Sequence, residues 1–277
     1  MNAPAFEDPR AVLGRHGLAP KRSFSQNFLV SRHAVEGIAA AATAGAVGGV
    51  VVELGPGAGT LTAALLRAGA QVVAVEKDRE MIALLRAEFG AVPHLRVVEG
   101  DAARVELDAL DAGPMPVICG NLPYAITGAI LERLVALAPR IRRAVVMVQR
   151  EVRDRLVALP GTKTWGAPSV FVQARFEVGT VLKVPAGAFH PPPEVDSAVV
   201  SLVPRAVPLA EEDDALRTIV RAAFGTRRKT LRNGLVREVG PLADPLLQAA
   251  GVDGRRRGET LAIAELAALA AALRAAR

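Results

Sequence analysis

The stretch from Val50 to Glu76 constrains the fold more than any other part of this sequence. Two apolar, β-branched runs, Val50–Leu54 and Gln71–Val75, flank a glycine-rich loop and a predicted helix over Leu61–Ala68. Apolar runs without polar alternation are typical of buried parallel strands, and the helix between them completes a strand-helix-strand unit. The stretch therefore predicts an open α/β sheet, in which ligands bind at the C-terminal edge of the strands.

The loop of this unit, Glu53–Gly59, indicates which class of ligand to expect. Its pattern is E-x-G-x-G-x-G, and glycines at alternate positions let the backbone approach a bulky ligand closely. Glu76 follows the second strand, where a carboxylate can hydrogen-bond both hydroxyls of a ribose. Dinucleotide enzymes usually carry G-x-G-x-x-G instead. The spacing here resembles the first motif of S-adenosylmethionine-dependent methyltransferases, with a tight turn in any doubly wound domain as the alternative.

Further elements are expected along the chain, after an irregular arm at residues 1–20. Helices are expected over Arg32–Thr43, Met81–Phe89 and Arg150–Leu159. Strands are expected over Leu95–Val98, Pro116–Cys119, Val145–Val148, Phe171–Val178 and Ser197–Val203. Thr60 is expected to cap the helix after the glycine loop, and Gly69 to end that helix in a left-handed conformation. The remainder is expected to be helical, which predicts two domains, 1–205 and 206–277.

The composition limits the other classes of protein that the chain can belong to. With 277 residues, 51% of them hydrophobic and 22% charged, it can bury a full core and is not a disordered protein. A formal net charge of +6 favours a polyanionic partner. The single cysteine, Cys119, and the scattered histidines argue against a disulfide framework or a metal site, as expected of a cytoplasmic protein. Neither a secretory signal nor a membrane-spanning segment is expected.

Polar side chains near the predicted sheet edge are candidate ligand contacts. Gln26 and Asn27 lie between two phenylalanines. They can hydrogen-bond a ligand, or they can simply pack the loop. Asp101 follows the strand expected over Leu95–Val98, so it reaches the same edge as Glu76. Its carboxylate can accept a hydrogen bond from the exocyclic amine of an adenine, with a helix N-cap as the equally plausible alternative.

The segment Gly120-Asn121-Leu122-Pro123-Tyr124 is the most specific signal in the chain. An N-[LIP]-P-[YFW] motif after a fourth strand marks enzymes that methylate an exocyclic amino nitrogen of a base. The adenine N6 lone pair is delocalised into the ring, so this nitrogen is a poor nucleophile until acceptors hold it. The Asn121 side-chain oxygen and the Leu122 carbonyl can accept its two hydrogens. Pro123 fixes the backbone, and Tyr124 offers a face on which a flipped base can stack. The alternative is a turn beside a core tyrosine.

Phe189 is a candidate for the second wall of a base pocket. It precedes His190 and three successive prolines, which stiffen the backbone. Held in this way, its ring is expected to lie opposite Tyr124. The alternative is an ordinary core phenylalanine.

The segment Arg217–Arg237 predicts a nucleic-acid contact. It holds seven basic residues and no acidic one. Leu231 and Leu235 can bury one face of a helix, while Arg228 and Arg232 present another. A solvated charged face is the usual explanation, but uncompensated charges favour an RNA-binding face. The residues predicted to contact RNA are Arg221, Arg227, Arg228, Lys229 and Arg232.

Five segments in one order carry a resemblance to a known family. They are SFSQNFL at 23–29, VELGPGAGTLT at 52–62, GNLPYAIT at 120–127, AFHPPPEVDSAVVSLVP at 188–204 and RRKTLRN at 227–233. Together they resemble the ribosomal RNA adenine dimethyltransferase family and, within it, the bacterial branch that acts on 16S rRNA. The resemblance implies a Rossmann-like S-adenosylmethionine-dependent methyltransferase domain and a small C-terminal helical domain.

The resemblance and the local arguments together define the expected site. Cofactor contacts are expected at Gln26, Asn27, Leu29, Gly55, Gly57, Glu76, Asp101 and Asn121. Catalytic, base-holding positions are expected at Asn121, Leu122, Pro123, Tyr124 and Phe189. Ser25 stands where the family usually has glycine, which leaves the geometry of the N-terminal loop open.

The implied reaction is transfer of methyl groups from S-adenosylmethionine to N6 of two adjacent adenosines in the 3′-terminal hairpin of 16S rRNA, within the assembling 30S subunit. A monomer that uses no metal is expected. Three alternatives stay open. An erythromycin-resistance type enzyme would modify 23S rRNA, although the Asn-Leu-Pro-Tyr and RRKTLRN segments argue against it. A nicotinamide-dependent oxidoreductase would need a pyrophosphate loop. A non-catalytic ribosome assembly factor would not need Asn121.

Overall fold

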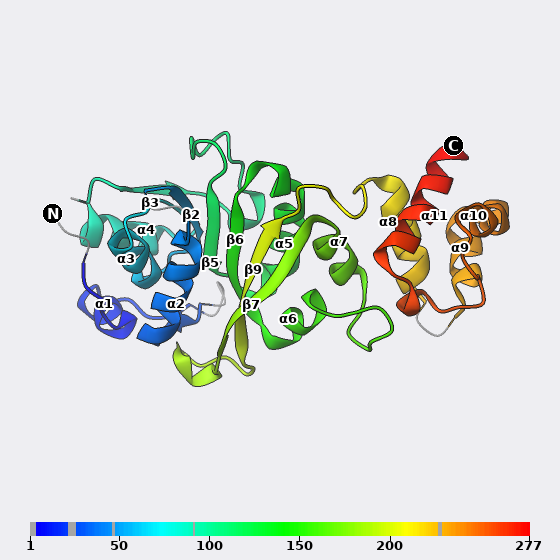
Figure 1. Ribbon diagram of the computed structural model, residues 1–277. Helices are drawn as coiled ribbons and strands as arrows, with labels where there is room; N and C mark the ends of the chain where they lie inside the picture. Colours follow the sequence, from blue (N-terminus) through cyan, green and yellow to red (C-terminus); the bar gives the residue numbers. More distant parts are fainter. Residues whose placement is uncertain (1–3, 22–25, 46–47, 91, 227–228) are drawn as a thin grey trace. The chain divides into compact units, whose positions relative to one another are not determined.

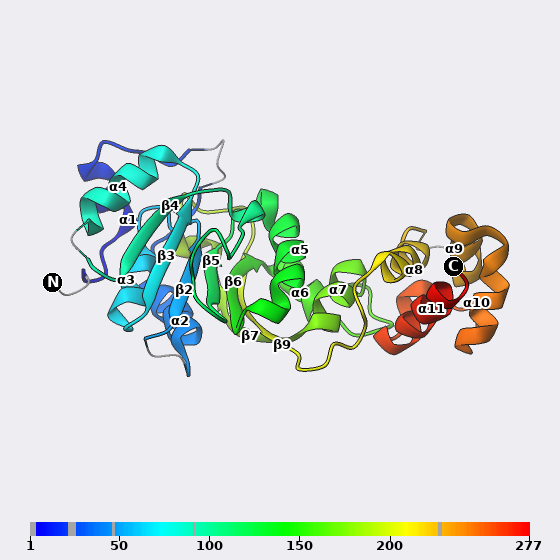
Figure 2. The same cartoon turned by 90° about the horizontal axis from the view of Figure 1, so that it is seen from above.

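A seven-stranded sheet organises the first part of the chain in the computed structural model, which describes residues 4–21, 26–45, 48–90, 92–226 and 229–277 (Figure 1). The strands lie in the order β4-β3-β2-β5-β6-β9-β7, and Figure 2 shows β4 to β6 side by side. Their bounds are β2 Val50–Leu54, β3 Gln71–Glu76, β4 Leu95–Glu99, β5 Val117–Asn121, β6 Arg143–Gln149, β7 Phe176–Val184 and β9 Ser197–Pro204. A small separate sheet pairs β1 (Phe28–Leu29) with β8 (Phe189–His190).

The direction of the strands places a switch point in the middle of the large sheet. Strands β4, β3, β2, β5 and β6 are parallel, and β9 is antiparallel to β6. From β2 the chain moves outward through β3 to β4, and it then crosses to β5 on the other side of β2. The strand order therefore reverses between β2 and β5. In open α/β sheets, ligands bind beside the C-terminal ends of the strands at this point.

Helices cover the apolar residues of the strands. The helices of this part are α2 Arg32–Thr43, α3 Thr60–Arg67, α4 Arg79–Phe89, α5 Thr127–Leu137 and α6 Arg150–Leu156. Because alternate strand residues face opposite sides of a sheet, Val51 of β2 and Cys119 of β5 share one buried cluster with α2, α3 and Phe89 of α4. The expected helices are confirmed, except that α6 ends three residues earlier than predicted.

The N-terminal segment contains a helix, so the prediction of an irregular arm was wrong there. Helix α1 spans Pro9–Arg15. Asp8 caps it by accepting a backbone N–H at 2.9 Å, and proline is well tolerated at the first helical position. Val12 and Leu13 are buried, in one cluster with Phe28. Proline acts here as a helix start rather than as a breaker.

The segment Phe171–Val178 also differs from its prediction as a strand. Its first five residues belong to helix α7 (Ala167–Arg175), and β7 begins at Phe176. The helix begins after Gly166, whose backbone N–H donates to the Ser169 hydroxyl at 3.1 Å. The phenylalanines and valines of this segment favour a strand locally, but packing of the buried side chains of α7 overrides that preference.

The ends of α3 bear out one of two expectations. The N-cap residue is Gly59, at φ +80°, and no side chain caps this end. The prediction that Thr60 caps the helix was therefore wrong. At the other end, Gly69 adopts φ +83°, which confirms the left-handed helix end.

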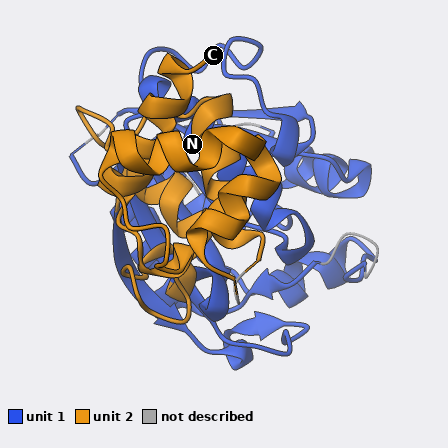
Figure 3. Ribbon diagram, turned by 90° about the vertical axis from the view of Figure 1, so that its right-hand side faces the viewer, with its two compact units in different colours: residues 1–153, 178–204 blue, residues 154–177, 205–277 orange. Residues whose placement is uncertain are grey.

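The chain forms two compact units, coloured separately in Figure 3: residues 1–153 with 178–204, and residues 154–177 with 205–277. The second unit is helical and contains α7, α8 Asp214–Phe224, α9 Leu231–Val239, α10 Ala243–Ala250 and α11 Ile263–Ala275. Its core includes Trp165, whose ring N–H donates to the Leu261 carbonyl at 3.1 Å. The expected helical region, 206–277, lies within this unit. No helix among the described residues is both long and apolar enough to cross a bilayer.

Candidate active site

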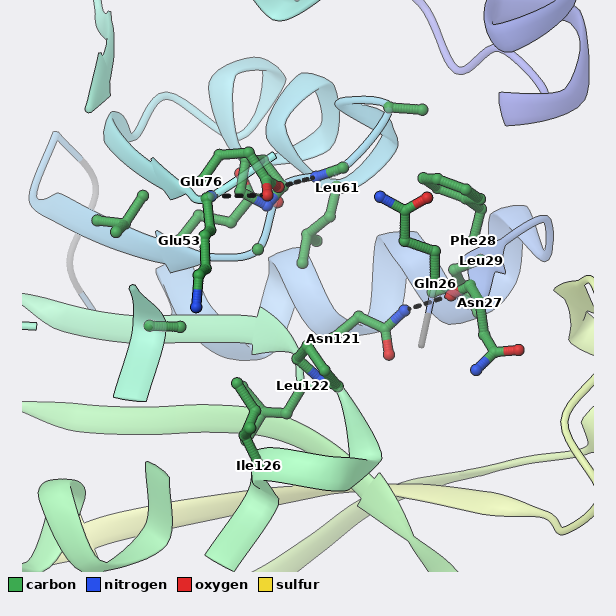
Figure 4. Close-up of a pocket in the computed structure, with 18 of the residues that line it drawn as sticks. Gln26, Asn27, Phe28, Leu29, Glu53, Leu61, Glu76, Asn121, Leu122 and Ile126 are labelled. Atoms are coloured by element: carbon green, nitrogen blue, oxygen red, sulfur yellow. Dashed lines mark hydrogen bonds between the residues drawn. The ribbon is translucent and has the colours of Figure 1, made fainter. Parts of the chain in front are cut away.

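A pocket of about 240 Å³ lies in the first unit, at the C-terminal ends of β2, β3 and β5 (Figure 4). It occupies the switch point of the sheet. The predicted site residues that line it are Gln26, Asn27, Leu29, Gly55, Gly57, Glu76, Asp101, Asn121, Leu122, Pro123 and Tyr124. The structure thus brings together every predicted cofactor contact and all of the Asn-Leu-Pro-Tyr segment.

The glycine loop depends on backbone conformations that other residues rarely adopt. Gly55 and Gly57 have φ values of +69° and +54°. A Cβ atom on Gly57 would lie only 2.9 Å from the Phe28 ring, whereas one on Gly55 would meet nothing within 4 Å. Gly57 is therefore required for packing as well as conformation. Gly55 leaves open space beside the pocket, into which a ligand can approach the backbone.

Glu76 is held in place by three backbone N–H groups. Its Oε1 accepts from Lys77 at 2.8 Å and Asp78 at 2.9 Å, and its Oε2 accepts from Gly57 at 3.1 Å. These bonds join the end of β3 to the glycine loop. Since a carboxylate offers about four acceptor positions, Glu76 retains capacity to accept a hydroxyl hydrogen from a ligand in the pocket.

Asp101 lines the pocket and also caps a helix. Its Oδ1 accepts from the Ala103 backbone N–H at 3.0 Å at the start of a short 3₁₀ turn. Its Oδ2 pairs with the Lys77 ammonium at 2.9 Å. The hydrogen bond from Lys77 is the main reason why the pKa of Asp101 lies below its usual value. The N-cap alternative is thus confirmed, and it is compatible with a ligand contact because the ionised carboxylate is an acceptor only.

Asn121 ends β5 and is oriented by the N-terminal loop. Its Nδ2 donates to the Asn27 backbone carbonyl at 2.8 Å, as the dashed line in Figure 4 shows. This bond fixes which end of the amide carries the nitrogen, so the other end presents Oδ1 as an acceptor. The next residue, Leu122, is buried, and its backbone N–H donates to the Met147 carbonyl at 3.3 Å. The backbone at the pocket rim is therefore anchored on β6.

Tyr124 is a half-buried ring with a fixed position. Its hydroxyl shares a hydrogen bond of 2.6 Å with the Ser197 hydroxyl at the start of β9. Burial is the main cause that raises the pKa of the Tyr124 hydroxyl above its usual value. Tyr124 and Asn27 also line a neighbouring hollow of about 340 Å³, together with Pro191 and Pro193. Gln26 lines both spaces as well, so Gln26, Asn27 and Tyr124 lie at the boundary between the pocket and this hollow.

Phe189 lies in a different setting from the one predicted. It belongs to β8, opposite Leu29 of β1, and its side chain is only 3% exposed within the main apolar cluster. It does not line the pocket at the strand ends or the neighbouring hollow. The core alternative describes this conformation, because the ring offers no exposed face to a base. A stacking role for Phe189 stays a prediction.

Two acidic residues of the site were not among the predicted contacts. Glu53, only 1% exposed, lines the pocket and accepts from the Thr62 hydroxyl at 2.6 Å. Burial raises its pKa to about 8. Asp78 lies behind Glu76 and caps α4. Glu53 could have been predicted as a site residue, since it is the first residue of the glycine motif. Asp78 is recognisable in the sequence only as a possible helix cap.

The basic segment of the second unit is compensated by acids that the local sequence did not show. Arg221 lies 3.7 Å from Glu238, and Arg232 pairs with Asp244 at 2.6 Å. The premise that the charges are uncompensated was therefore wrong for these two arginines, because the fold brings acids from α9 and α10 to them. Their contact with RNA stays a prediction. Lys229 is exposed. The remaining predicted contacts, Arg227 and Arg228, lie outside the described residues.

Comparison with known proteins agrees with this geometry. The sequence model of a family described as ribosomal RNA adenine dimethylase matches residues 17–273. The ribosomal RNA small subunit methyltransferase A of Anaeromyxobacter sp. (strain K) is 44% identical over 95% of this chain and 97% of its own length. The protein of the same name from Myxococcus xanthus (strain DK1622) is also 44% identical, over 97% of this chain and 96% of its own.

Two solved structures share the fold. A dimethyladenosine transferase from Plasmodium falciparum has a TM-score of 0.76 at 24% identity, covering 87% of this chain and 95% of that one. The 23S rRNA methyltransferase ErmE has a TM-score of 0.65 at 29% identity, covering 90% and 100%. These likenesses confirm the predicted Rossmann-like methyltransferase fold. Because the family model matches residues 17–273 and two ribosomal RNA methyltransferases are 44% identical over nearly all of the chain, this chain belongs to the ribosomal RNA adenine dimethylase family.

Proposed function

We propose that this methyltransferase uses S-adenosylmethionine to methylate N6 of two adjacent adenosines in the 3′-terminal hairpin of 16S rRNA, twice on each base, during assembly of the 30S subunit. The observation that carries the proposal is the bond from the Asn121 amide to the Asn27 carbonyl beside a glycine-lined pocket. It presents an oriented acceptor to an amino group that enters from the neighbouring hollow.

The pocket residues fit S-adenosylmethionine. Gly55 leaves room for close approach to the backbone, Glu76 can accept from ribose hydroxyls, and Asp101 can accept from the adenine amine. When bound, the cofactor supplies an electrophilic methyl group on a sulfonium, which is also a good leaving group. The protein therefore has no need of a covalent nucleophile of its own, and its task is to place the two reactants.

The rim of the pocket supplies the base-holding groups. The Asn121 Oδ1 and the Leu122 carbonyl accept the two N6 hydrogens, which draws the nitrogen lone pair out of conjugation and directs it into the pocket. Tyr124, fixed by Ser197, provides a ring face for stacking. Pro191 and Pro193 of the neighbouring hollow offer apolar surface on another side of the entering nucleotide.

The names of the relatives support the choice of 16S rRNA as the substrate. Those at 44% identity are named as small subunit methyltransferases, whereas the large-subunit enzyme ErmE is 29% identical. The intact Asn121 arrangement supports an enzyme over a non-catalytic assembly factor. Lys229, Arg221 and Arg232 are exposed, and exposed ion pairs are weak. Phosphates of the RNA can thus replace the acids that pair with the arginines. We also propose that the protein acts as a cytoplasmic monomer.

The test is methylation of isolated ribosomal subunits that lack both modifications. Labelled S-adenosylmethionine is supplied with small or large subunits, and RNA fragments are analysed by mass spectrometry. Dimethyladenosine at two neighbouring positions of the small-subunit hairpin is the expected result. Label only in the large subunit would assign the chain to the 23S type. Cofactor binding without label in either subunit would favour an assembly factor.

A further inference from the structure

Asp78 connects two parts of the site that lie on different segments. Its backbone N–H donates to Glu76 Oε1 at 2.9 Å, which places it directly behind the carboxylate at the end of β3. Its side chain belongs to a residue only 3% exposed, and it caps α4 by accepting from the Glu80 backbone N–H at 3.0 Å. A buried carboxylate needs hydrogen-bond donors around it. The donors to Asp78 therefore show which segments of the chain it holds together.

The other partners of Asp78 come from the N-terminal segment. Its Oδ1 accepts from the Lys21 ammonium at 2.8 Å, and its Oδ2 accepts from Gln26 Nε2 at 3.0 Å. Gln26 Oε1 in turn accepts from the Lys21 backbone N–H at 2.8 Å. Burial raises the pKa of Asp78, but the hydrogen bonds from Lys21, Glu80 and Gln26 outweigh it and hold this pKa below its usual value. Both the oxygen and the nitrogen of the Gln26 side-chain amide are thus hydrogen-bonded within the protein.

The residue after Gln26 supplies the carbonyl that orients Asn121. On the N-terminal side of this carbonyl, Gln26 is anchored on Asp78. On the C-terminal side, Phe28 and Leu29 are paired with β8. The Asn27 carbonyl oxygen is therefore held from both directions, and Asn121 Nδ2 donates to it at 2.8 Å.

We propose that Asp78 is a positioning residue for methyl transfer, because its bond to Gln26 holds the Asn27 carbonyl where that carbonyl orients the Asn121 amide. The role of Asn121 in this inference rests on the proposed function. One buried carboxylate then supports both Glu76, through its backbone N–H, and Asn121, through Gln26 and Asn27. The same anchor sets the cofactor side and the base side of the pocket relative to each other.

A reciprocal exchange of groups tests this inference. In Asp78→Asn, the side-chain oxygen still caps α4, since asparagine is as good an N-cap as aspartate, but an NH₂ group faces Gln26 Nε2. In Gln26→Glu, two carboxylates face each other across the same gap and repel. The double variant Asp78→Asn with Gln26→Glu restores the hydrogen bond in the reverse direction, because the new amide NH₂ at position 78 donates to the new carboxylate at position 26. Glu80→Gln is the control, because it removes the 2.8 Å pair with Lys21 but leaves the bond between Asp78 and Gln26.

Three quantities are measured on each full-length variant. They are kcat for methylation, the affinity for S-adenosylhomocysteine by calorimetry, and the hydrogen exchange rate of the Asn121 side-chain NH₂ group. The last is followed by NMR in protein labelled with ¹⁵N-asparagine. The chain has only four asparagines, Asn2, Asn27, Asn121 and Asn233, so the signal is assigned by its loss in Asn121→Ala.

We expect each single variant to lower kcat by about 10-fold or more, since small displacements of positioned groups are costly, with cofactor affinity changed only a few-fold. The Asn121 NH₂ hydrogens should exchange faster in both. The double variant should recover kcat and slow exchange, and Glu80→Gln should keep both at the wild-type level. Wild-type values in Asp78→Asn would overturn the inference, and so would a loss that the double variant does not recover. If the wild-type protein methylates no ribosomal RNA while the Asn121 signal responds as expected, the proposed function fails, and only the orientation of the Asn121 amide by Asp78 is supported.

Discussion

Asn121 serves an amino-methylating site only if its amide presents oxygen to the base, and the Asn27 carbonyl selects that orientation. The bond is 2.8 Å long and joins two residues that lie 94 positions apart in the sequence. The carbonyl can only accept, so it excludes the flipped amide. The motif alone names the residue, but the N-terminal loop determines which atom it offers.

Replacing Asn121 by alanine should abolish turnover while leaving the cofactor site intact. We expect kcat to fall by at least about 100-fold, because the N6 nitrogen loses an acceptor and its placement. The affinity for S-adenosylhomocysteine should stay within a few-fold of wild type, since Glu76 and the glycine loop do not depend on this side chain. Single-turnover kinetics and calorimetry measure the two quantities. Loss of cofactor binding instead would make Asn121 a structural residue.

Glu53 predicts a pH dependence of stability that falls in the neutral range. Burial raises its pKa from 4.5 to about 8, Glu76 adds to the rise, and the Thr62 hydroxyl opposes it. Between these two pH values the folded chain binds a proton that the unfolded chain has lost. The contribution of Glu53 to the free energy of unfolding should therefore decrease as pH rises from about 4.5 to 8.

Glu53→Gln isolates this contribution, because the amide cannot ionise. Urea unfolding at several pH values should show the wild-type protein losing stability relative to Glu53→Gln as pH rises. Cys119, whose thiol pKa is raised mainly by burial, stays neutral throughout the window and does not contribute. An equal pH dependence in both proteins would show that Glu53 ionises normally in the fold.

At the scale of the element, a glycine can be required for its backbone conformation, for the space beside it, or for both. Gly57 needs both a positive φ and space beside the Phe28 ring. Gly251, which ends α10 at φ +65°, needs only the conformation, since a Cβ there would meet nothing within 4 Å. The two glycines are therefore a matched pair.

Gly57→Ala should weaken both stability and cofactor binding, whereas Gly251→Ala should affect stability alone. A left-handed conformation costs a non-glycine residue about 1–2 kcal/mol, which we expect in both variants as a lower free energy of unfolding. In Gly57→Ala the displaced Phe28 ring should also reduce affinity for the cofactor. Urea unfolding and calorimetry provide the two readouts. Unchanged cofactor affinity in Gly57→Ala would show that the loop adapts to a methyl group.

Most elements of the first unit could be predicted from the sequence because their signals are local. Buried parallel strands, the glycine loop and the Asn-Leu-Pro-Tyr segment all carry their pattern within a few residues. Helix α7 could not be predicted in this way, because the core that buries its Val170 and Ala174 is made largely by residues beyond position 210. Helix α1 depends on Asp8 and on packing against Phe28, a residue outside the helix.

The predicted site shows the same difference between local signals and contacts made by residues distant in the sequence. The residues that end neighbouring strands, such as Glu76 and Asn121, could be placed at one edge by topology alone. Asp78 could not be recognised as a link, since its partners Lys21 and Gln26 are more than fifty positions away. Phe189 was predicted as an exposed wall, but the pairing of β8 with β1 buries it.

At the scale of the whole molecule, basic side chains of the second unit are paired with acids that lie at other positions of the sequence. Arg232 pairs with Asp244 and Arg274 with Asp213, both in the second unit. The net charge of +6 then acts as a general attraction to RNA. We propose that the specific contacts are those at which a phosphate of the RNA replaces an acid as the partner of an exposed cation.

Salt dependence of RNA binding distinguishes these contacts. Replacing Lys229 and Arg232 by glutamine should weaken binding and reduce the slope of log K against log salt by about one unit for each lost phosphate contact. Arg274→Gln, which breaks a similar pair in the same unit, should leave the slope unchanged. Filter binding of the 16S hairpin at several salt concentrations measures both. A common slope for all three proteins would assign Lys229 and Arg232 to the solvated surface.

The division of the chain between the units has a consequence for its synthesis. Residues 154–177 belong to the second unit, yet 178–204 return to complete the sheet of the first. On the translating ribosome, α7 and Trp165 emerge well before α8 and α11, with which they share a core. The nascent chain thus exposes this apolar segment until the final helix is made. A product truncated after residue 205 would keep it exposed permanently, as a binding site for chaperones.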